Sequence, residues 1–360
     1  MRLLALCLIP LLCMGCQKQQ TGGTAAVATM SGAAQTQPAP GDPAYVAEDP
    51  RFSRLVGMPG PAIMLQAIDG SMIDLAGLYG KKPVYLKLWA SYCMPCRAQM
   101  PKFQKIYETV GDRIQVIAVN AGIGDDAAKA TAFATRVAIH MPIAIDDGSL
   151  GSWLKMQGTP VHIVIDRAGR VAFVGTQDGP ALDAAIQDVQ RAGPTQAAPA
   201  RTAPMQRVVA LKPGDAVPQI TLSGSNGSDM PLYDAVGLPR AILFTSTWCE
   251  DYLQEIEPQT VEKCRRTRNE VSKLLRANNV RWLGVVTHLW TTPQDLSAYL
   301  AKTRQKLPFA IDTEGAAFRV FGIRRFPAVA LIDAHGRLHR IVGPDDTDLS
   351  AAVADLAKQG

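Results

Sequence analysis

The chain has 360 residues, of which 47% are apolar and 19% charged, a composition typical of folded globular proteins rather than disordered chains. The net charge is +5, and because there is no Lys/Arg block, the sequence offers no electrostatic basis for nucleic-acid binding. No apolar stretch reaches the roughly 18 residues of a membrane-spanning helix, which excludes a multi-pass membrane protein. The length predicts two domains.

The start of the chain predicts a targeting segment. An apolar stretch over 3–14 is too short to span a bilayer and ends in Cys13-Met-Gly-Cys16. This ending resembles the signal of bacterial lipoproteins, which implies a signal peptide over 1–15 and a lipid on Cys16. An ordinary signal peptide with incidental cysteines is the alternative. Both interpretations predict export to a compartment where disulfides form.

Two segments of biased composition divide the remaining chain. Residues 16–50 are rich in Ala, Gly, Gln, Thr and Pro, which predicts a flexible tether, and a Pro/Ala-rich stretch over 193–210 predicts a linker. Two segments of domain length are left, 51–192 and 211–360. We expect each of them to fold as a domain.

The two long segments repeat each other. Cys93 matches Cys249 at a spacing of 156 residues, whereas Pro160 matches Pro327 at a spacing of 167. The second copy therefore carries about 11 extra residues after Cys249. Two repeats of domain length indicate a duplication.

Strands and helices alternate in the first copy. Four apolar runs predict buried strands, at residues 84–89, 114–119, 161–165 and 171–174. Helical spacing of apolar residues predicts three helices, at residues 96–110, 127–137 and 180–191. This order predicts the α/β fold class, with a mixed central sheet flanked by helices in each domain.

The motif Cys93-Met-Pro-Cys96 lies where a predicted strand ends and a helix begins. A helix N-terminus offers free N–H groups and a positive dipole end, which stabilise the thiolate that attacks disulfides. We expect Cys93, as the less enclosed cysteine, to be the nucleophile and Cys96 to resolve the mixed disulfide. Half of a zinc site is the alternative, but His140 and His162 are too far apart in sequence to complete it. No metal or cofactor is predicted.

The first copy resembles the exported, membrane-tethered thiol–disulfide oxidoreductases of thioredoxin fold, the TlpA/ResA type. The resemblance is carried by Gly57-Met-Pro-Gly-Pro, Leu88-Trp-Ala-Ser-Tyr-Cys-Met-Pro-Cys-Arg, Pro101, Gly158-Thr-Pro160 and Val164-Ile-Asp166. It implies two tandem thioredoxin-like domains and reduction of protein disulfides by electrons from an inner-membrane thiol donor. It also implies a cis peptide before Pro160, facing the sulfur of Cys93.

Two positions depart from this family, and a third differs from thioredoxin itself. Tyr92 replaces the usual Trp before the first cysteine, and Gln99 stands where many members carry a Glu near the site. Lys87 occupies the position of a buried Asp in thioredoxin. A buried Lys87 would favour the thiolate, and a solvated lysine at the sheet edge is the alternative.

The second copy keeps Cys249 and Pro327, but Tyr252 replaces its second cysteine. The spacing between Cys96 and Cys264 nearly equals the spacing between the matched prolines Pro160 and Pro327. This agreement predicts that Cys264 is the displaced resolving cysteine. The alternative is that Cys264 is a buried helix residue and that Cys249 acts alone or not at all.

A disulfide between Cys249 and Cys264 has a geometric requirement. A continuous helix would separate the two residues by about 22 Å, whereas a disulfide needs Cα atoms within about 7 Å. The hypothesis therefore requires residues 250–263 to fold back, for which Pro258 offers a break.

The sequence thus predicts an exported protein-disulfide reductase with two disulfides, Cys93–Cys96 and Cys249–Cys264, and two site prolines, Pro160 and Pro327. The second domain would relay electrons or bind a partner. The alternatives are a redox-regulated binding module and a Sco-like copper chaperone that uses Cys249, Cys264 and His288. The predicted location is the periplasmic side of a bacterial membrane, the outer membrane being favoured because Gln17 is not the aspartate associated with inner-membrane retention.

Overall fold

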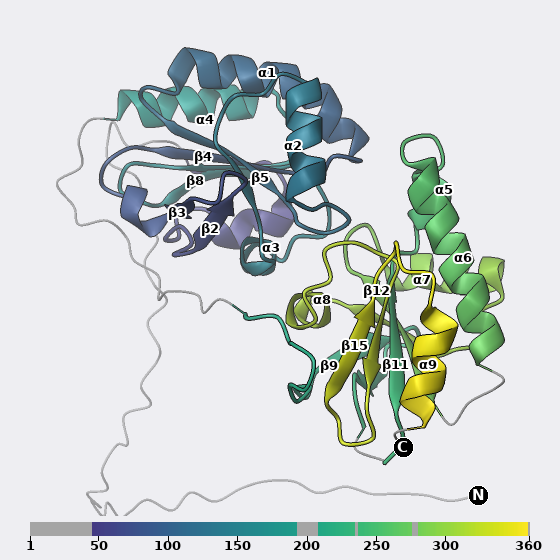
Figure 1. Cartoon of the computed structure of the whole chain (residues 1–360). Helices are drawn as coiled ribbons and strands as arrows, with labels where there is room; N and C mark the ends of the chain where they lie inside the picture. Colours follow the sequence, from purple (N-terminus) through teal and green to yellow (C-terminus); the bar gives the residue numbers. More distant parts are fainter. Residues whose placement is uncertain (1–44, 193–207, 235–236, 276–279, 359–360) are drawn as a thin grey trace, which may run out of the picture. The chain divides into compact units, whose positions relative to one another are not determined.

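The computed structural model describes residues 45–192, 208–234, 237–275 and 280–358 (Figure 1). The predicted signal peptide, Cys16 and most of the predicted tether and linker lie outside the described residues. No helix in the described ranges is both long and apolar enough to cross a membrane.

The described part of the first domain contains an eight-stranded mixed sheet in the order β1-β8-β7-β4-β5-β6-β2-β3. Its strands are β1 (Val46–Ala47), β2 (Met64–Ala67), β3 (Met72–Asp74), β4 (Val84–Trp89), β5 (Gln115–Asn120), β6 (Ile143–Ile145), β7 (Val161–Ile165) and β8 (Val171–Gly175). The neighbours β4, β5 and β6 run parallel, whereas β7 is antiparallel to both β4 and β8.

Helices cover both faces of the first sheet. They are the 3₁₀ helices η1 (Pro50–Leu55) and η2 (Ala76–Leu78) and the α-helices α1 (Met94–Val110), α2 (Ala127–Arg136), α3 (Ser149–Leu154) and α4 (Pro180–Arg191). Figure 1 shows α1 and α4 on one face of this sheet and α3 on the other. Every residue of β4 is buried, because a central strand with helices on both faces has no solvated side.

The fold begins earlier than the sequence predicts. Residues 45–50 were expected in the tether, but Val46 and Ala47 form β1, which pairs parallel with β8. The carboxylate of Glu48 accepts hydrogen bonds from the backbone N–H groups of Thr176 and Gln177, at 3.0 and 3.1 Å. A two-residue strand is too short for its side-chain period to show in a sequence.

The second domain repeats the topology of the first. Its sheet has the order β10-β9-β13-β12-β11-β14-β15, which matches the first sheet from β3 to β8. The strands are β9 (Thr221–Gly224), β10 (Asp229–Pro231), β11 (Arg240–Thr245), β12 (Arg281–Thr287), β13 (Phe309–Asp312), β14 (Ala328–Ile332) and β15 (Leu338–Val342). This repetition agrees with the duplication that the sequence indicates, and the predicted α/β fold class is confirmed.

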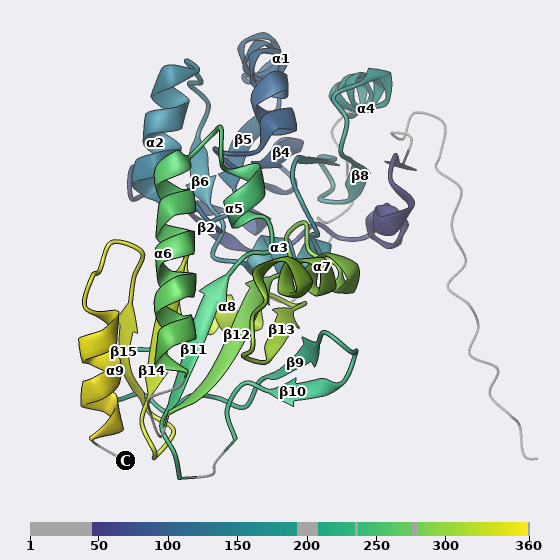
Figure 2. The same ribbon diagram turned by 90° about the vertical axis from the view of Figure 1, so that its right-hand side faces the viewer.

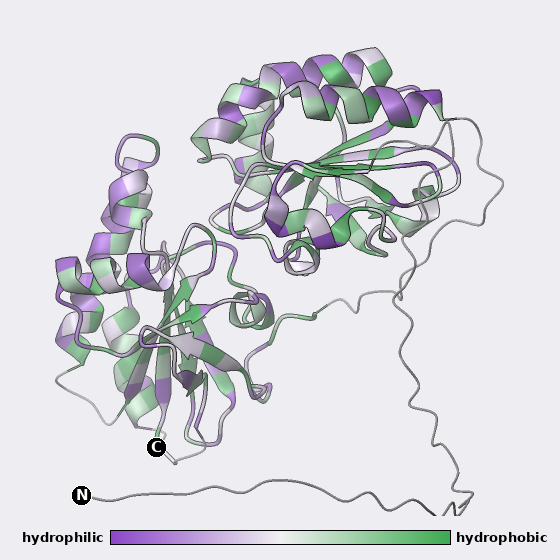
Figure 3. Ribbon diagram, turned by 180° about the vertical axis from the view of Figure 1, so that it is seen from behind, coloured by the Kyte–Doolittle hydropathy of each residue, from purple (hydrophilic) through white to green (hydrophobic). Residues whose placement is uncertain are grey.

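The helices of the second domain are α5 (Cys249–Tyr252), α6 (Pro258–Leu274), α7 (Pro293–Thr303), α8 (Ala316–Val320) and α9 (Leu349–Ala357). Figure 1 and Figure 2 show α6 and α9 together on one face of the sheet, with α8 on the other. In each domain the central strands are mostly apolar, whereas the helices carry both polar and apolar residues (Figure 3).

Candidate active site

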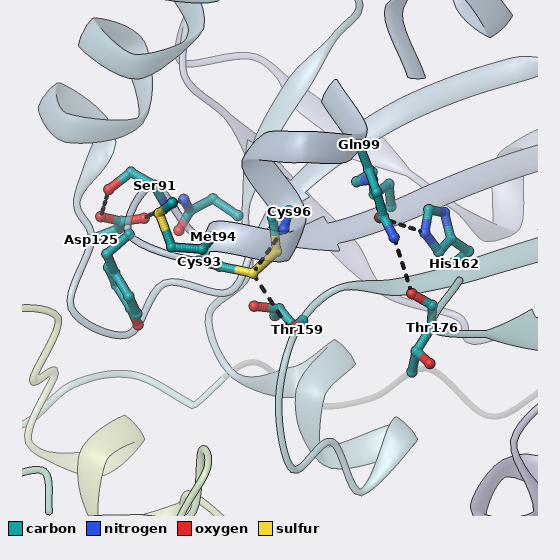
Figure 4. The surroundings of a disulfide bond; sticks show 12 residues. Ser91, Cys93, Met94, Cys96, Gln99, Asp125, Thr159, His162 and Thr176 are labelled. Carbon is teal, nitrogen blue, oxygen red and sulfur yellow. Dashed lines mark hydrogen bonds between the residues drawn. A yellow bond between two sulfur atoms is a disulfide. The ribbon is translucent and has the colours of Figure 1, made fainter. Parts of the chain in front are cut away.

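The first domain places two cysteines at the N-terminus of α1. β4 ends at Trp89, and four residues later Cys93 caps α1 and is joined to Cys96 by a disulfide with Cα atoms 5.2 Å apart (Figure 4). The sulfur of Cys93 accepts the backbone N–H of Cys96 at 3.2 Å. This N–H and the positive end of the helix would stabilise negative charge on Cys93 once the disulfide opens.

Burial does not separate the roles of the two cysteines. Cys93 is 1% exposed and Cys96 0%, so exposure does not distinguish the two cysteines. What distinguishes Cys93 is its place at the N-cap, where it accepts a helix N–H. The assignment of Cys93 as nucleophile therefore depends on electrostatics.

The loop before β7 faces the cysteine pair. The bond between Thr159 and Pro160 is cis, as the family resemblance implies, and the carbonyl oxygen of Thr159 lies 3.4 Å from the sulfur of Cys93. Pro160 has no N–H of its own, so its nitrogen offers no donor beside the sulfur. The second domain has a matching cis bond between Phe326 and Pro327.

A buried polar network lies behind the cysteines. Lys87 is 0% exposed, which settles the choice left open by the sequence, and its ammonium donates to Gln99 Oε1 at 2.6 Å. His162 Nε2 lies 3.0 Å from the same oxygen, and Tyr85 is bonded to His162 Nδ1 at 2.7 Å. Burial lowers the pKa of Lys87 to about 7.

On the other side of the cysteines, a carboxylate holds the loop between β4 and α1. Asp125 accepts hydrogen bonds from the backbone N–H and the hydroxyl of Ser91, at 2.6 and 2.5 Å, and from the amide of Asn120 at 2.7 Å. Burial, the largest influence, raises the pKa of Asp125, and these bonds oppose that rise. We call Asp125, Ser91 and Asn120 the Asp125 clamp, of which Figure 4 labels Asp125 and Ser91 on its left.

The second domain joins Cys249 to Cys264. α5 ends at Tyr252 and α6 begins at Pro258, so the chain breaks as the disulfide hypothesis requires. The Cα atoms of the two cysteines are 6.6 Å apart, and a disulfide links the sulfurs. Arg268 on α6 adds an ion pair to Glu250 on α5 at 2.6 Å.

Comparison with known proteins decides the family. The sequence profile of the Redoxin family matches residues 55–189 and 212–357, which together make up more than half of the chain. The chain belongs to the Redoxin family. Its two matches agree with the tandem thioredoxin-like domains.

Several relatives of this Redoxin chain are named as thioredoxin-like or thiol–disulfide exchange proteins. It is 31% identical to the thioredoxin-like protein YneN of Bacillus subtilis, over 33% of this chain and 72% of that protein. It is 28% identical to the thiol–disulfide oxidoreductase ResA of Bacillus anthracis, over 37% and 78%. It is 31% identical to the thiol:disulfide interchange protein DsbE of Yersinia pestis, over 35% and 68%. With the Cys93–Cys96 pair present, the chain is a thiol–disulfide oxidoreductase of thioredoxin fold.

The copper alternative has no assembled site in the described part of this Redoxin chain. His288 Nδ1 lies 3.1 Å from the carbonyl oxygen of Asp312. Within the described residues, no three His, Cys, Asp or Glu side chains come together as metal ligands. The set of Cys249, Cys264 and His288 is therefore not assembled as a metal centre.

The disulfide of the second Redoxin domain will stabilise that domain. Replacing both Cys249 and Cys264 with serine frees a loop of 15 residues in the unfolded chain, and we expect a loss of about 3 kcal/mol in free energy of unfolding. Hydrogen exchange of the β11 and β12 amides in denaturant measures this loss in free energy of unfolding. The matched control replaces Cys93 and Cys96, whose separation is 3 residues, and should cost the first domain about 1.4 kcal/mol less than the first pair of substitutions costs the second domain. Equal losses in the two domains would contradict the argument.

Proposed function

We propose that this chain is an exported reductase of protein disulfides. A lipid on Cys16 would hold it at the periplasmic side of a bacterial membrane, with the outer membrane favoured. The export and the anchor are supported by the apolar stretch and the Cys13-Met-Gly-Cys16 motif. The observation that carries the proposed chemistry is Cys93 at the N-cap of α1, facing the loop that ends in Pro160.

The reaction divides into two exchanges of sulfur bonds. The thiolate of Cys93 attacks one sulfur of the substrate disulfide, and the other substrate sulfur leaves as a thiolate. Cys96 then loses its proton and attacks the sulfur of Cys93. The bond between Cys93 and the substrate breaks, the second substrate thiolate leaves, and the Cys93–Cys96 disulfide forms. The substrate has gained two electrons, which a membrane thiol donor must return to the pair.

In the proposed scheme the second domain relays electrons to the first. The disulfide between Cys249 and Cys264 supports this role, because it gives the second domain a pair that can change redox state. A domain that only binds a partner is the other candidate. It is favoured by Tyr252, which stands where a second cysteine of a close pair would be.

One redox titration tests both the direction of electron flow between the chain and its substrate and the relay between the two domains. The full chain is equilibrated in glutathione buffers of graded potential, alkylated, and digested, and mass spectrometry reports the two cysteine pairs separately. For a reductase we expect a reduction potential of about −270 mV for the Cys93–Cys96 pair. A value of about −120 mV, typical of a dedicated oxidant, would overturn the proposal that the chain reduces its substrates. A relay toward the first domain requires the lower potential at Cys249–Cys264, and the reverse order contradicts it.

A further inference from the structure

Helix α5 of the second domain is too short to hold its own position. It has four residues, whereas helices shorter than about 12 residues are marginal in water without tertiary contacts. The place of Cys249 on α5 therefore depends on the links between α5 and its neighbours. One of these links is the disulfide to Cys264 on α6, and the reduction that a relay requires removes it. Another contact must then hold Cys264 beside Cys249 if the pair is to close again readily.

A pair of charged side chains joins the same two helices beside the disulfide. Glu250 follows Cys249 directly on α5. On α6, Arg268 lies four residues after Cys264, about one turn further along the helix. Arg268 Nε donates to Glu250 Oε1 at 2.6 Å, and Arg268 Nη2 donates to Glu250 Oε2 at 3.1 Å. Figure 2 shows α5 beside the first turns of α6. We call Glu250 and Arg268 the α5–α6 latch.

The geometry and burial of the latch distinguish it from an ordinary surface ion pair. Two hydrogen bonds between one guanidinium and one carboxylate fix the orientation of both side chains. The side chains of Glu250 and Arg268 are 16% and 20% exposed, so water and salt screen their attraction less than that of a solvated pair. Arg265 adds a third contact to Glu250 at 3.5 Å. These contacts do not involve a sulfur atom, so they can persist when the disulfide is open.

Two other residues near the cysteine hold α5 in different ways. Asp251 pairs with Lys302 at 2.5 Å, but Lys302 belongs to α7 and both side chains are exposed. This pair therefore does not bridge the two helices that carry the cysteines. Leu253 is buried and packs in the core just after α5. Apolar packing of Leu253 is thus the alternative to the latch as the contact that holds the helical hairpin in the dithiol state.

We propose that Glu250 and Arg268 are positioning residues that keep Cys264 within reach of Cys249 when their disulfide is open. The inference rests on the proposed relay and adds to it the contact that brings the displaced cysteine into the reaction. The thiolate of Cys249 attacks the disulfide that it reduces, and one sulfur of that acceptor leaves as a thiolate. Cys264 then loses its proton to solvent and attacks the sulfur of Cys249. The mixed disulfide breaks, the second acceptor sulfur leaves with the electron pair, and the Cys249–Cys264 disulfide forms.

The reduction potential of the second pair tests this role in the full chain. The unaltered chain and its variants are equilibrated at pH 7 in dithiothreitol buffers of graded potential, alkylated, digested and analysed by mass spectrometry. In Glu250→Gln and in Arg268→Gln we expect the equilibrium constant for closing the Cys249–Cys264 disulfide to fall by about tenfold, as for the loss of a charge-assisted hydrogen-bonded pair. This fall corresponds to a rise of about 30 mV in reduction potential. The first-domain pair in the same sample is the internal reference and should not shift.

The direction of the shift separates the latch from a direct effect of charge on the thiols. Removing the negative charge of Glu250 favours a nearby thiolate, and removing the positive charge of Arg268 disfavours it, so a purely electrostatic effect moves the potential in opposite directions. The latch predicts a rise in both variants and no further rise when they are combined, because either change breaks the same contact. The matched control is Asp251→Asn, which neutralises the adjacent acid of α5 without altering the latch and should leave the potential unchanged.

The outcomes separate the inference from the proposed relay. If the Cys249–Cys264 disulfide does not open at any potential, the relay fails and the inference fails with it. If the pair opens with the same potential in Glu250→Gln, in Arg268→Gln and in the unaltered chain, the relay stands and the latch is overturned. Opposite shifts in the two variants also overturn the latch. A merely structural ion pair stabilises both redox states equally and gives no shift.

A measurement on the unaltered chain keeps the inference testable if a variant does not fold. The backbone N–H groups of Ile256 and Glu257 donate to the carbonyl of Leu253, at 3.1 and 2.7 Å, within the reversal between α5 and α6. If the latch holds the hairpin, these two amides should remain protected from hydrogen exchange after both disulfides are reduced. Exchange at the rate of an unfolded peptide in the reduced chain would overturn the proposal.

Discussion

Replacing Cys93 with serine will reduce the rate of protein-disulfide reduction to that of buffer alone. A hydroxyl is not ionised at neutral pH and cannot form the mixed disulfide. Serine is a good N-cap residue, and its oxygen can accept the N–H of Cys96, so α1 and the fold should be retained. The measurement is the reduction of insulin by the full chain with dithiothreitol as electron donor.

The matched control for this experiment is Cys249→Ser. With dithiothreitol as donor the second domain is not needed to supply electrons, so the control should keep most of the activity. Residual turnover in Cys93→Ser equal to that of the unaltered chain would show that the chemistry resides elsewhere. Cys96→Ser should instead accumulate a mixed disulfide on Cys93, because the attack on the substrate remains and the release does not.

The second large effect is expected at the Asp125 clamp. Asp125→Ala removes the acceptor of the Ser91 N–H, the Ser91 hydroxyl and the Asn120 amide, and leaves these donors without a partner inside the protein. Each unsatisfied buried donor costs about 1–3 kcal/mol, so we expect the first domain to lose about 3 kcal/mol in free energy of unfolding. Hydrogen exchange of the β4 and β5 amides in denaturant measures this loss.

The neighbouring residue provides the control for the clamp. Asp126 caps α2 through the N–H of Lys129 at 2.9 Å, and its replacement by alanine should cost only about 1 kcal/mol. Ser91 lies two residues before Cys93, so Asp125→Ala should also slow insulin reduction, whereas Asp126→Ala should not. If the two variants are equally stable and equally active, the clamp does not hold the loop.

The sequence was sufficient for the regular parts of the first domain. The apolar run over 84–89 and the helical spacing over 127–137 are long enough to show their periods, and both elements lie where they were predicted. The strands β1, β2, β3 and β6 were missed, because two to four residues carry no recognisable period. The turn at Pro258 was foreseen only because two matched cysteines needed to meet.

The polar surroundings of the site could not be derived from the sequence. Asp125 lies in a loop with Asp126 beside it, and nothing in the pattern tells which of the two is buried. Lys87 lies in a strand whose two faces are both covered, so alternation of polar and apolar residues gives no orientation. One signal was available in the sequence. Lys87 and Gln99 both differ from the residues usual in related proteins, and in the structure they hydrogen-bond to each other.

The two disulfides enclose rings of very different size. Between Cys93 and Cys96 the chain is one turn at the start of a helix, so opening that bond frees almost no backbone. Between Cys249 and Cys264 the bond spans the reversal from α5 to α6, and opening it releases a longer segment, for which the entropy gain is larger. In the proposed relay, opening the second pair would be coupled to the order of the α5–α6 hairpin, whereas opening the first would release only one turn of helix.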